Sequence, residues 1–185
     1  MVSNIIQFVY NNKIIKLNNP DPNKTILDYI RSDLKQKGTK EGCAEGGCGA
    51  CTVVIAELKD NKLNYKSINS CISFLPTLDK KYLILVENLI TEDHKLHPVQ
   101  EALVKFHGSQ CGFCTPGFVM SLFAMYKNFP KFDDETIDEV LSGNLCRCTG
   151  YRPIIDAAKS LNSKNIIDHF RKNEKKIINL LTKIK

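Results

Sequence analysis

The chain has 185 residues, 43% of them hydrophobic, and carries a net charge of +6 at pH 7. This composition supports a packed core and argues against wholesale disorder, and no apolar run is long enough to span a bilayer. Residues 1–10 lack the basic start, apolar stretch and cleavage site of a signal peptide, so we expect a cytoplasmic protein with no membrane partner.

The positive charge is concentrated at the C-terminal end. Residues 159–185 hold eight of the 26 basic side chains and two of the 20 acidic ones, so residues 1–158 are neutral overall. A nucleic-acid-binding protein usually carries its basic patch on the folded body. The tail therefore predicts a solvated helix or linker, and no nucleic-acid partner is expected.

The first half of the chain has the pattern of strands around one helix. Apolar residues alternate over 6–10 and 14–17, and Asn11-Asn12 between them offers a hairpin turn. Thr25 can cap a helix over residues 26–34. Further strands are expected at 52–56, 63–67 and 82–86, with a turn at Asn61-Lys62 between the first two. Several strands packed on one helix predict a small α+β domain.

A first group of cysteines interrupts this half in a glycine-rich loop. Cys43, Cys48 and Cys51 have the spacing C-x4-C-x2-C, and Cys71 follows after nineteen intervening residues. This is the arrangement of plant-type [2Fe–2S] ferredoxins, and glycine permits the tight turns that bring backbone amides toward the sulfurs. The alternative is a structural zinc site, but zinc sites usually use paired C-x2-C knuckles.

The second half of the chain, beyond a seam near residues 90–98, has the pattern of a short helical bundle. Proline or a capping residue marks the start of each expected helix, and these starts fall near Pro98, Thr115, Asp134 and Pro153.

A second group of cysteines belongs to these helices. Cys111 and Cys114 form a C-x2-C pair before one expected helix, and Cys146 and Cys148 form a C-x-C pair between two others. Helix N-termini stabilise thiolates, so the two pairs could together hold one metal centre. By spacing alone, a zinc knuckle or a thioredoxin-like dithiol remains open for the first pair. Four disulfides are not expected in a reducing cytosol.

Three longer segments carry a family resemblance. They are Gly38–Glu41 with the loop and strand that follow, residues 107–117, and residues 141–154. Over about residues 4–160 the chain resembles the iron–sulfur portion of the molybdenum hydroxylases. The resemblance implies an α+β fold: a plant-ferredoxin-like (β-grasp) domain over 1–90, a four-helix-bundle [2Fe–2S] domain over 91–162, and a basic amphipathic tail over 163–185 leading toward an FAD domain.

Within this family, residues 68–76 and 96–100 most resemble the small subunit of bacterial xanthine dehydrogenases. The implied function is electron transfer in purine catabolism, from a molybdenum–pterin centre through two [2Fe–2S] clusters to FAD. One alternative is the same portion of another molybdenum hydroxylase, which oxidises aldehydes, carbon monoxide or N-heterocycles. A remote alternative is a zinc-binding module with no redox role.

The resemblance also assigns partners and residues. It places the pterin on a molybdenum-bearing large subunit, with Gln110 and Cys148 beside it, and places FAD on another subunit or on a missing domain. Cys148 would also ligate the second cluster. No nucleophile with a nearby base appears in the sequence, so we expect no substrate-transforming site on this chain. His107 is expected to be structural, and His94 and His97, in a connecting segment, are assigned no chemistry.

Overall fold

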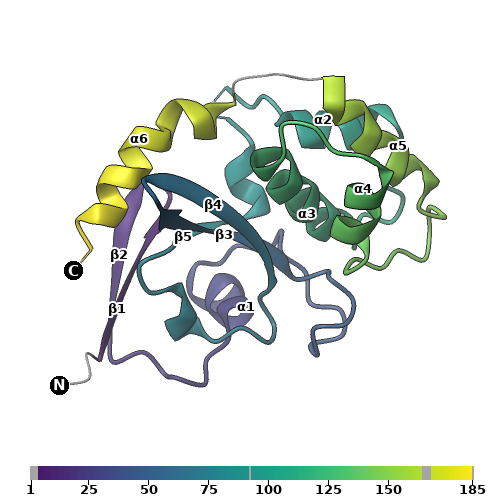
Figure 1. Ribbon diagram of the computed structural model, residues 1–185. Coiled ribbons are helices and arrows are strands. Elements are labelled where there is room, and N and C mark those ends of the chain that lie inside the picture. The colour runs from purple at the N-terminus through teal and green to yellow at the C-terminus, as the bar shows by residue number, and fades with distance from the viewer. Residues whose placement is uncertain (1–3, 92, 164–167, 185) are drawn as a thin grey trace.

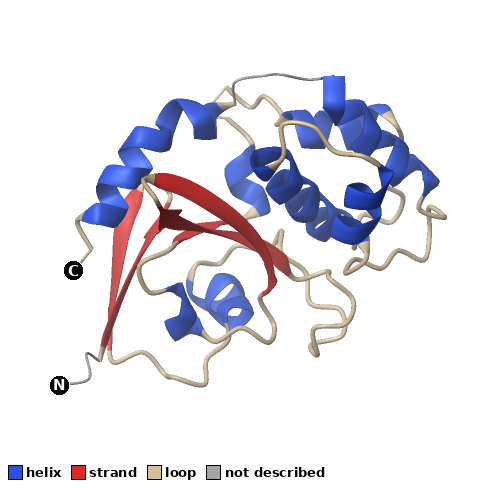
Figure 2. Ribbon diagram, in the orientation of Figure 1, coloured by secondary structure: helices blue, strands red, loops and turns tan. Residues whose placement is uncertain are grey.

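A five-stranded sheet and a group of helices lie side by side in the computed structural model, which describes residues 4–91, 93–163 and 168–184 (Figure 1). The strand order in the sheet is β2-β1-β5-β3-β4. Strand β5 runs parallel to β1 and antiparallel to β3. The strands are β1 (Ile5–Tyr10), β2 (Lys13–Asn18), β3 (Thr52–Lys59), β4 (Lys62–Asn69) and β5 (Tyr82–Ile84). The expected α+β class is confirmed (Figure 2).

Two hairpins build the outer parts of the sheet. The turn between β1 and β2 is Asn11-Asn12, as expected, and both residues have positive φ angles. The turn between β3 and β4 is Asp60-Asn61, one residue before the expected position. A tight turn of this type needs two successive residues that tolerate positive φ. Asp and Asn meet this requirement, which leaves Lys62 to pair with Lys59 in the ladder.

The expected helix after Thr25 is mostly a π-helix. The Thr25 hydroxyl caps it by accepting a hydrogen bond from the Asp28 amide at 3.0 Å. The α-helical turn α1 spans only Ile26–Asp28, and η1 (Tyr29–Asp33) continues it as a π-helix in which the Leu34 amide donates to the Tyr29 carbonyl. Its apolar side chains pack on one face of the sheet with Phe8 and Leu83.

Four helices follow the sheet in the chain, and the expected helix starts are confirmed to within one residue. They are α2 (Pro98–Lys105), α3 (Thr115–Asn128), α4 (Asp134–Leu141) and α5 (Arg152–Ser160). Short 3-10 turns are η2 (Leu75–Leu78), η3 (Val86–Leu89) and η4 (Leu161–Ser163). Strand β5 is two residues shorter than expected because η3 begins at Val86.

Helix α3 lies at the centre of a core that the two halves share. Val54, Ala56 and Tyr65 of the sheet belong to the same buried cluster as Phe118 and Phe123 of α3. No seam of solvent separates the sheet from the helices in the described residues, because this single cluster runs from one to the other. None of the described helices is long and apolar enough to cross a membrane.

The basic tail folds back onto the chain. Helix α6 (His169–Thr182) crosses the end of the sheet near β1 and β4, seen in yellow in Figure 1. Phe170, Ile177 and Leu181 are buried against the body, while Arg171, Lys172, Lys175 and Lys176 are exposed. The amphipathic tail thus buries its apolar stripe against its own sheet and presents its lysines to solvent.

A buried three-residue network holds the start of α6. The Asp168 carboxylate lies 3.0 Å from His97 Nε2 and 3.1 Å from Lys127 Nζ, and it caps α6 by accepting from the Arg171 amide. His97 Nδ1 accepts from the Val99 amide, so the ring proton lies on Nε2 and points to Asp168. His97, to which the sequence assigned no role, therefore joins α2 to α6 across 71 residues of sequence.

Replacing the carboxylate tests this network. Asp168→Asn leaves the Lys127 ammonium, whose side chain is only 10% exposed, without a counter-charge. We expect a loss of about 3 kcal/mol in the free energy of unfolding, measured by urea denaturation. The matched control is Asp134→Asn, which breaks the exposed Lys159–Asp134 pair and should cost less than about 1 kcal/mol. Equal losses in the two variants would contradict a role for the buried network.

The same network predicts a pH dependence. Burial lowers the pKa of His97 despite the nearby Asp168 carboxylate, so the unfolded chain binds the proton more readily, and stability should decrease as pH falls below about 6.5. Burial alone would raise the pKa of Asp168, but the His97 hydrogen bond and the Lys127 charge hold it well below its usual range. The contribution of the ionised Asp168 to stability should persist until the pH falls below about 4.

Urea denaturation between pH 7.5 and 5 tests the loss of stability that we assign to His97. His97→Gln retains a donor toward Asp168 but does not titrate, so its stability should fall less steeply over this range. If the unfolding free energy falls equally steeply with decreasing pH in the variant and the wild type, His97 is not the source of the pH dependence.

Candidate metal centres

The first cysteine loop directs backbone amides at one sulfur. Cys43 Sγ accepts hydrogen bonds from the amides of Gly47 and Cys48, each at 3.3 Å, and from Glu45 at 3.5 Å. Ala44, Gly46 and Gly49 have positive φ angles that turn the chain around this sulfur. The hydrogen bonds from Glu45 and Cys48 lower the pKa of Cys43 to about 7. The loop therefore favours the thiolate form, which is the form that binds metals.

The fourth cysteine of this group lies against the loop, as its spacing predicts. Cys71 follows β4, and its sulfur is 3.2 Å from that of Cys51. The side chains of Asn69 and Ser70 donate to the carbonyls of Gly46 and Cys51, both at 2.7 Å. Burial, and then the hydrogen bond with Cys51, raises the pKa of the Cys71 thiol to about 12.

The second group meets at the start of α3. Cys114 is the residue before this helix, and the sulfurs of Cys111 and Cys148 are 3.5 Å apart. Cys146 is buried, with its sulfur 3.2 Å from Thr149 Oγ1. Burial alone would raise the pKa of Cys146, but hydrogen bonds from Thr149 and from the Cys148 backbone lower it to about 7. Burial raises the pKa of Cys114 to about 12.

The two cysteine loops touch through their backbones. The Leu145 amide, next to Cys146, donates to the Cys48 carbonyl at 3.0 Å. A Cβ atom at Gly117 would lie 2.2 Å from the Gly49 carbonyl oxygen, and one at Gly49 would lie 2.3 Å from the Gly143 carbonyl oxygen. Glycine at 49 and 117 therefore permits a backbone contact that any other residue would prevent.

Sequence reasoning assigned no role to Gly117 or Asn144. Asn144 is 3% exposed and donates from Nδ2 to the Gly49 carbonyl at 3.0 Å. The motif segment 141–154 includes Asn144, but a helix-ending asparagine and an interdomain asparagine look the same in sequence. Only the fold separates the two.

The remaining candidate residues lie near the second group or away from both. Gln110 is exposed and directly precedes Cys111, which is also exposed, as is Cys148. His107 has a positive φ and follows the end of α2, and His94 lies in an exposed turn.

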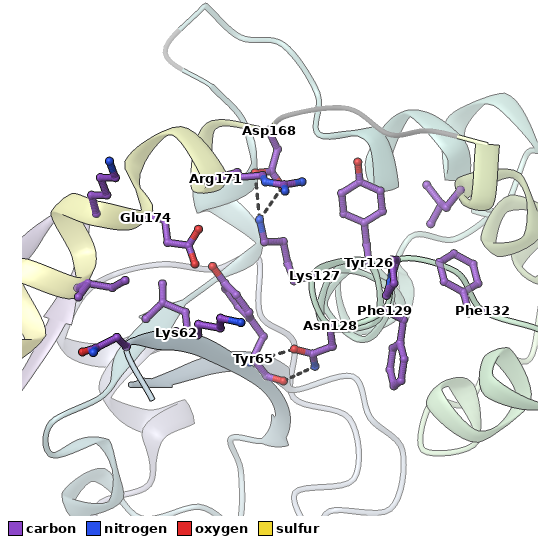
Figure 3. Close-up of a pocket in the computed structure, with 16 residues that line it drawn as sticks. Lys62, Tyr65, Tyr126, Lys127, Asn128, Phe129, Phe132, Asp168, Arg171 and Glu174 are labelled. Carbon is purple, nitrogen blue, oxygen red and sulfur yellow. Dashed lines mark hydrogen bonds and ion pairs between the residues drawn. The ribbon is translucent and has the colours of Figure 1, made fainter. Parts of the chain in front are cut away.

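One cavity in the described part of the chain lies away from the cysteine loops. It has a volume of about 630 Å³ and lies between the β3–β4 hairpin, the end of α3 and α6, and no cysteine lines it. Figure 3 shows Asn128 paired with the Tyr65 backbone there, and Lys127 pointing toward Asp168. We therefore assign the candidate chemistry to the two cysteine groups and not to this cavity.

The donor chemistry fits iron–sulfur clusters better than single ions. Each group offers four sulfur atoms, and none of the eight cysteines is in a disulfide. In the described part of the chain, no three or more His, Cys, Asp or Glu side chains are arranged to hold one metal ion. Four thiolates with amide donors aimed at a sulfur are the usual surroundings of a cluster.

Two family models match the chain, one over each cysteine group. The model for a 2Fe-2S iron–sulfur cluster binding domain matches residues 8–75, and that for a [2Fe-2S] binding domain matches residues 85–159. The fold and the two loops thus define a protein with two [2Fe–2S]-binding domains, as expected.

Several curated proteins that are similar to this chain are xanthine dehydrogenases. Xanthine dehydrogenase of Emericella nidulans is 49% identical over 160 residues, and xanthine dehydrogenase/oxidase of Felis catus is 44% identical over 162 residues. These matches take in 85% and 86% of this chain but only 12% of each relative.

Two solved oxidoreductase structures are also similar to this chain. Quinoline 2-oxidoreductase of Pseudomonas putida superposes with a TM-score of 0.69 at 29% identity, over 89% of this chain and 100% of that one. Aldehyde oxidoreductase of Desulfovibrio desulfuricans gives 0.74 at 31% identity, over 86% of this chain and 17% of that one. The chain belongs to the iron–sulfur portion of the molybdenum hydroxylase family.

The glycine contact between the loops gives a direct test. Gly117→Ala places a methyl group against the Gly49 carbonyl, and neither backbone can move freely. We expect a loss of about 3 kcal/mol in unfolding free energy, measured by urea denaturation. The control is Gly143→Ala, since a Cβ there meets nothing within 4 Å and should change stability by less than about 1 kcal/mol. A tolerated Gly117→Ala would contradict the close contact.

Proposed function

We propose that the eight cysteines hold two [2Fe–2S] clusters. Cys43, Cys48, Cys51 and Cys71 would ligate the first, and Cys111, Cys114, Cys146 and Cys148 the second. The observation that carries this proposal is that the fold brings together sulfurs from distant parts of the sequence, Cys51 with Cys71 at 3.2 Å and Cys111 with Cys148 at 3.5 Å. Such clusters, when bound, accept and release electrons at potentials set by their surroundings.

The protein's own groups would tune these centres. Backbone amides of Glu45, Gly47 and Cys48 stabilise negative charge on Cys43, and Thr149 does the same for Cys146. Burial shields Cys51, Cys71 and Cys146 from water, whereas Cys111 and Cys148 are exposed. The exposed pair is the part of the second group that a partner could approach.

The chain would serve as the electron-transfer portion of a xanthine dehydrogenase-type enzyme. Its identity to xanthine dehydrogenases reaches 49%, and its length matches only 12% of them, so the partner functions lie outside these residues. The partners would be a molybdenum–pterin chain, which contacts Gln110 and Cys148, and an FAD-binding domain or subunit that receives the electrons near the first loop. Purine oxidation would belong to the molybdenum chain.

A second candidate is the same role in a different molybdenum hydroxylase. The matches to quinoline 2-oxidoreductase and aldehyde oxidoreductase support it. Identity near 30% to these proteins, against 43–49% to the xanthine dehydrogenases, favours the first candidate.

We also propose the boundaries and location. Residues 1–90 would form the ferredoxin-type domain, 91–162 the helical domain and 163–185 the tail leading toward FAD. Eight cysteines without disulfides are typical of a reducing compartment, which supports the cytoplasm.

Metal analysis tests the proposal directly. The protein should contain about four iron atoms per chain and, after reduction, show two distinct paramagnetic signals. Zinc in place of iron, with no visible absorbance, would contradict the redox function.

Single cysteine variants test the ligand sets. Cys148→Ser should remove one paramagnetic signal and about two iron atoms per chain, because one of four ligands is lost. Cys71→Ser should remove the other signal and leave the first. Loss of both signals in either variant would contradict two separate ligand sets.

A test of the substrate class requires the chain in complex with its partners. The chain in complex with its molybdenum partner should be reduced by hypoxanthine, and less readily by aldehydes or quinoline. Reduction by an aldehyde or N-heterocycle but not by any purine would favour the second candidate.

A further inference from the structure

Asn144 lies where the two cysteine loops meet, and every polar atom of its amide is used. Oδ1 accepts a hydrogen bond from the Ser121 hydroxyl at 2.6 Å. Nδ2 donates to the Gly49 carbonyl at 3.0 Å and to Thr52 Oγ1 at 3.3 Å. Its side chain thus links α3 to the end of the first cysteine loop.

The orientation of this amide is fixed by its neighbours. The Thr52 hydroxyl donates to the Gly49 carbonyl at 2.7 Å, so the Thr52 oxygen can only accept from Asn144. A reversed amide would place its oxygen against two acceptor oxygens in a buried site, which is strongly unfavourable. The site therefore requires a donor at Nδ2, and a carboxylate of the same shape cannot replace it.

Leu145, the residue after Asn144, also joins the two cysteine loops. The Leu145 amide donates to the Cys48 carbonyl, so Asn144 is next to a hydrogen bond that joins a residue of the first cysteine group to the segment bearing Cys146. With Gly49 and Gly117 in backbone contact, Asn144 is the side chain that holds the two loops at one separation and orientation.

We infer that Asn144 is a positioning residue that sets the interaction between the two metal centres. This inference rests on the proposed function, because it concerns the two clusters that the cysteines would hold. It does not depend on the substrate or on the partner subunits.

Asn128 provides a matched control. It also joins the helices to the sheet, donating to the Tyr65 carbonyl at 2.6 Å and accepting from the Tyr65 amide at 3.2 Å. It lies at the other end of α3 from the cysteines (Figure 3). Asn128→Asp therefore perturbs an interdomain asparagine without touching the cysteine loops.

The test is electron paramagnetic resonance of the protein reduced by one and by two electrons. In the wild type, each signal should be broadened when the second centre is also reduced, because the loops hold the centres in a fixed relation. Asn144→Asp should retain both signals and lose or alter this mutual broadening, whereas Asn128→Asp should leave it unchanged. Unchanged broadening in Asn144→Asp, or its absence in the wild type, would overturn the inference.

A second measurement reports on the protein alone. Hydrogen exchange of the Leu145 amide should accelerate about tenfold or more in Asn144→Asp, since the loss of neighbouring buried hydrogen bonds lets this segment open more often. Asn128→Asp should not change it. An unchanged Leu145 exchange rate in Asn144→Asp would count against the positioning role.

If Asn144→Asp does not assemble both centres, Ser121→Ala decides the question. This variant removes only the donor to Oδ1 and leaves the contacts of Nδ2 in place. Altered broadening with both signals retained would support the inference, and unchanged broadening would overturn it. A wild-type protein without two iron signals would instead contradict the proposed function, so the two failures are distinguishable.

Discussion

The arrangement of the cysteine loops depends on a backbone contact that tolerates no side chain. Gly49 lies directly against Gly117 and Gly143, and this contact brings the first cysteine loop onto the N-terminal end of α3. The Leu145–Cys48 hydrogen bond and the buried amide of Asn144 follow from it. The two metal-binding loops are therefore parts of one interface and not separate sites joined by a linker.

The sequence predicted the chemistry of the site better than its geometry. Cysteine spacing and loop glycines indicated two groups of four sulfurs because ligand number and chain reach are local constraints. The roles of Gly117, Asn144 and His97 could not be predicted, because each depends on a residue distant in sequence, such as Gly49 or Asp168. Their residue types also occur at ordinary helix ends and caps.

In the fold, too, elements set by neighbouring residues were predicted, whereas contacts between residues distant in sequence were not. Prolines and caps gave the helix starts, and the Asn11-Asn12 turn was predicted from its residue types. The Asp60-Asn61 turn was misplaced by one residue, since either dipeptide at that position can turn the chain. The start of α6 contacts α2 and α3 through the buried His97–Asp168–Lys127 network, which a basic amphipathic pattern does not reveal.

The core shared between the sheet and α3 has a consequence for the order of assembly. A ribosome releases the N-terminal half first, and until α3 is made, Val54, Ala56 and Tyr65 have no helix packed over their face of the sheet. The ferredoxin-type half is then a sheet with one covered face and one bare apolar face, which is the kind of surface that chaperones recognise. The first cysteine loop, whose glycine contact is with α3, thus reaches its final packing only after the second half has been synthesised.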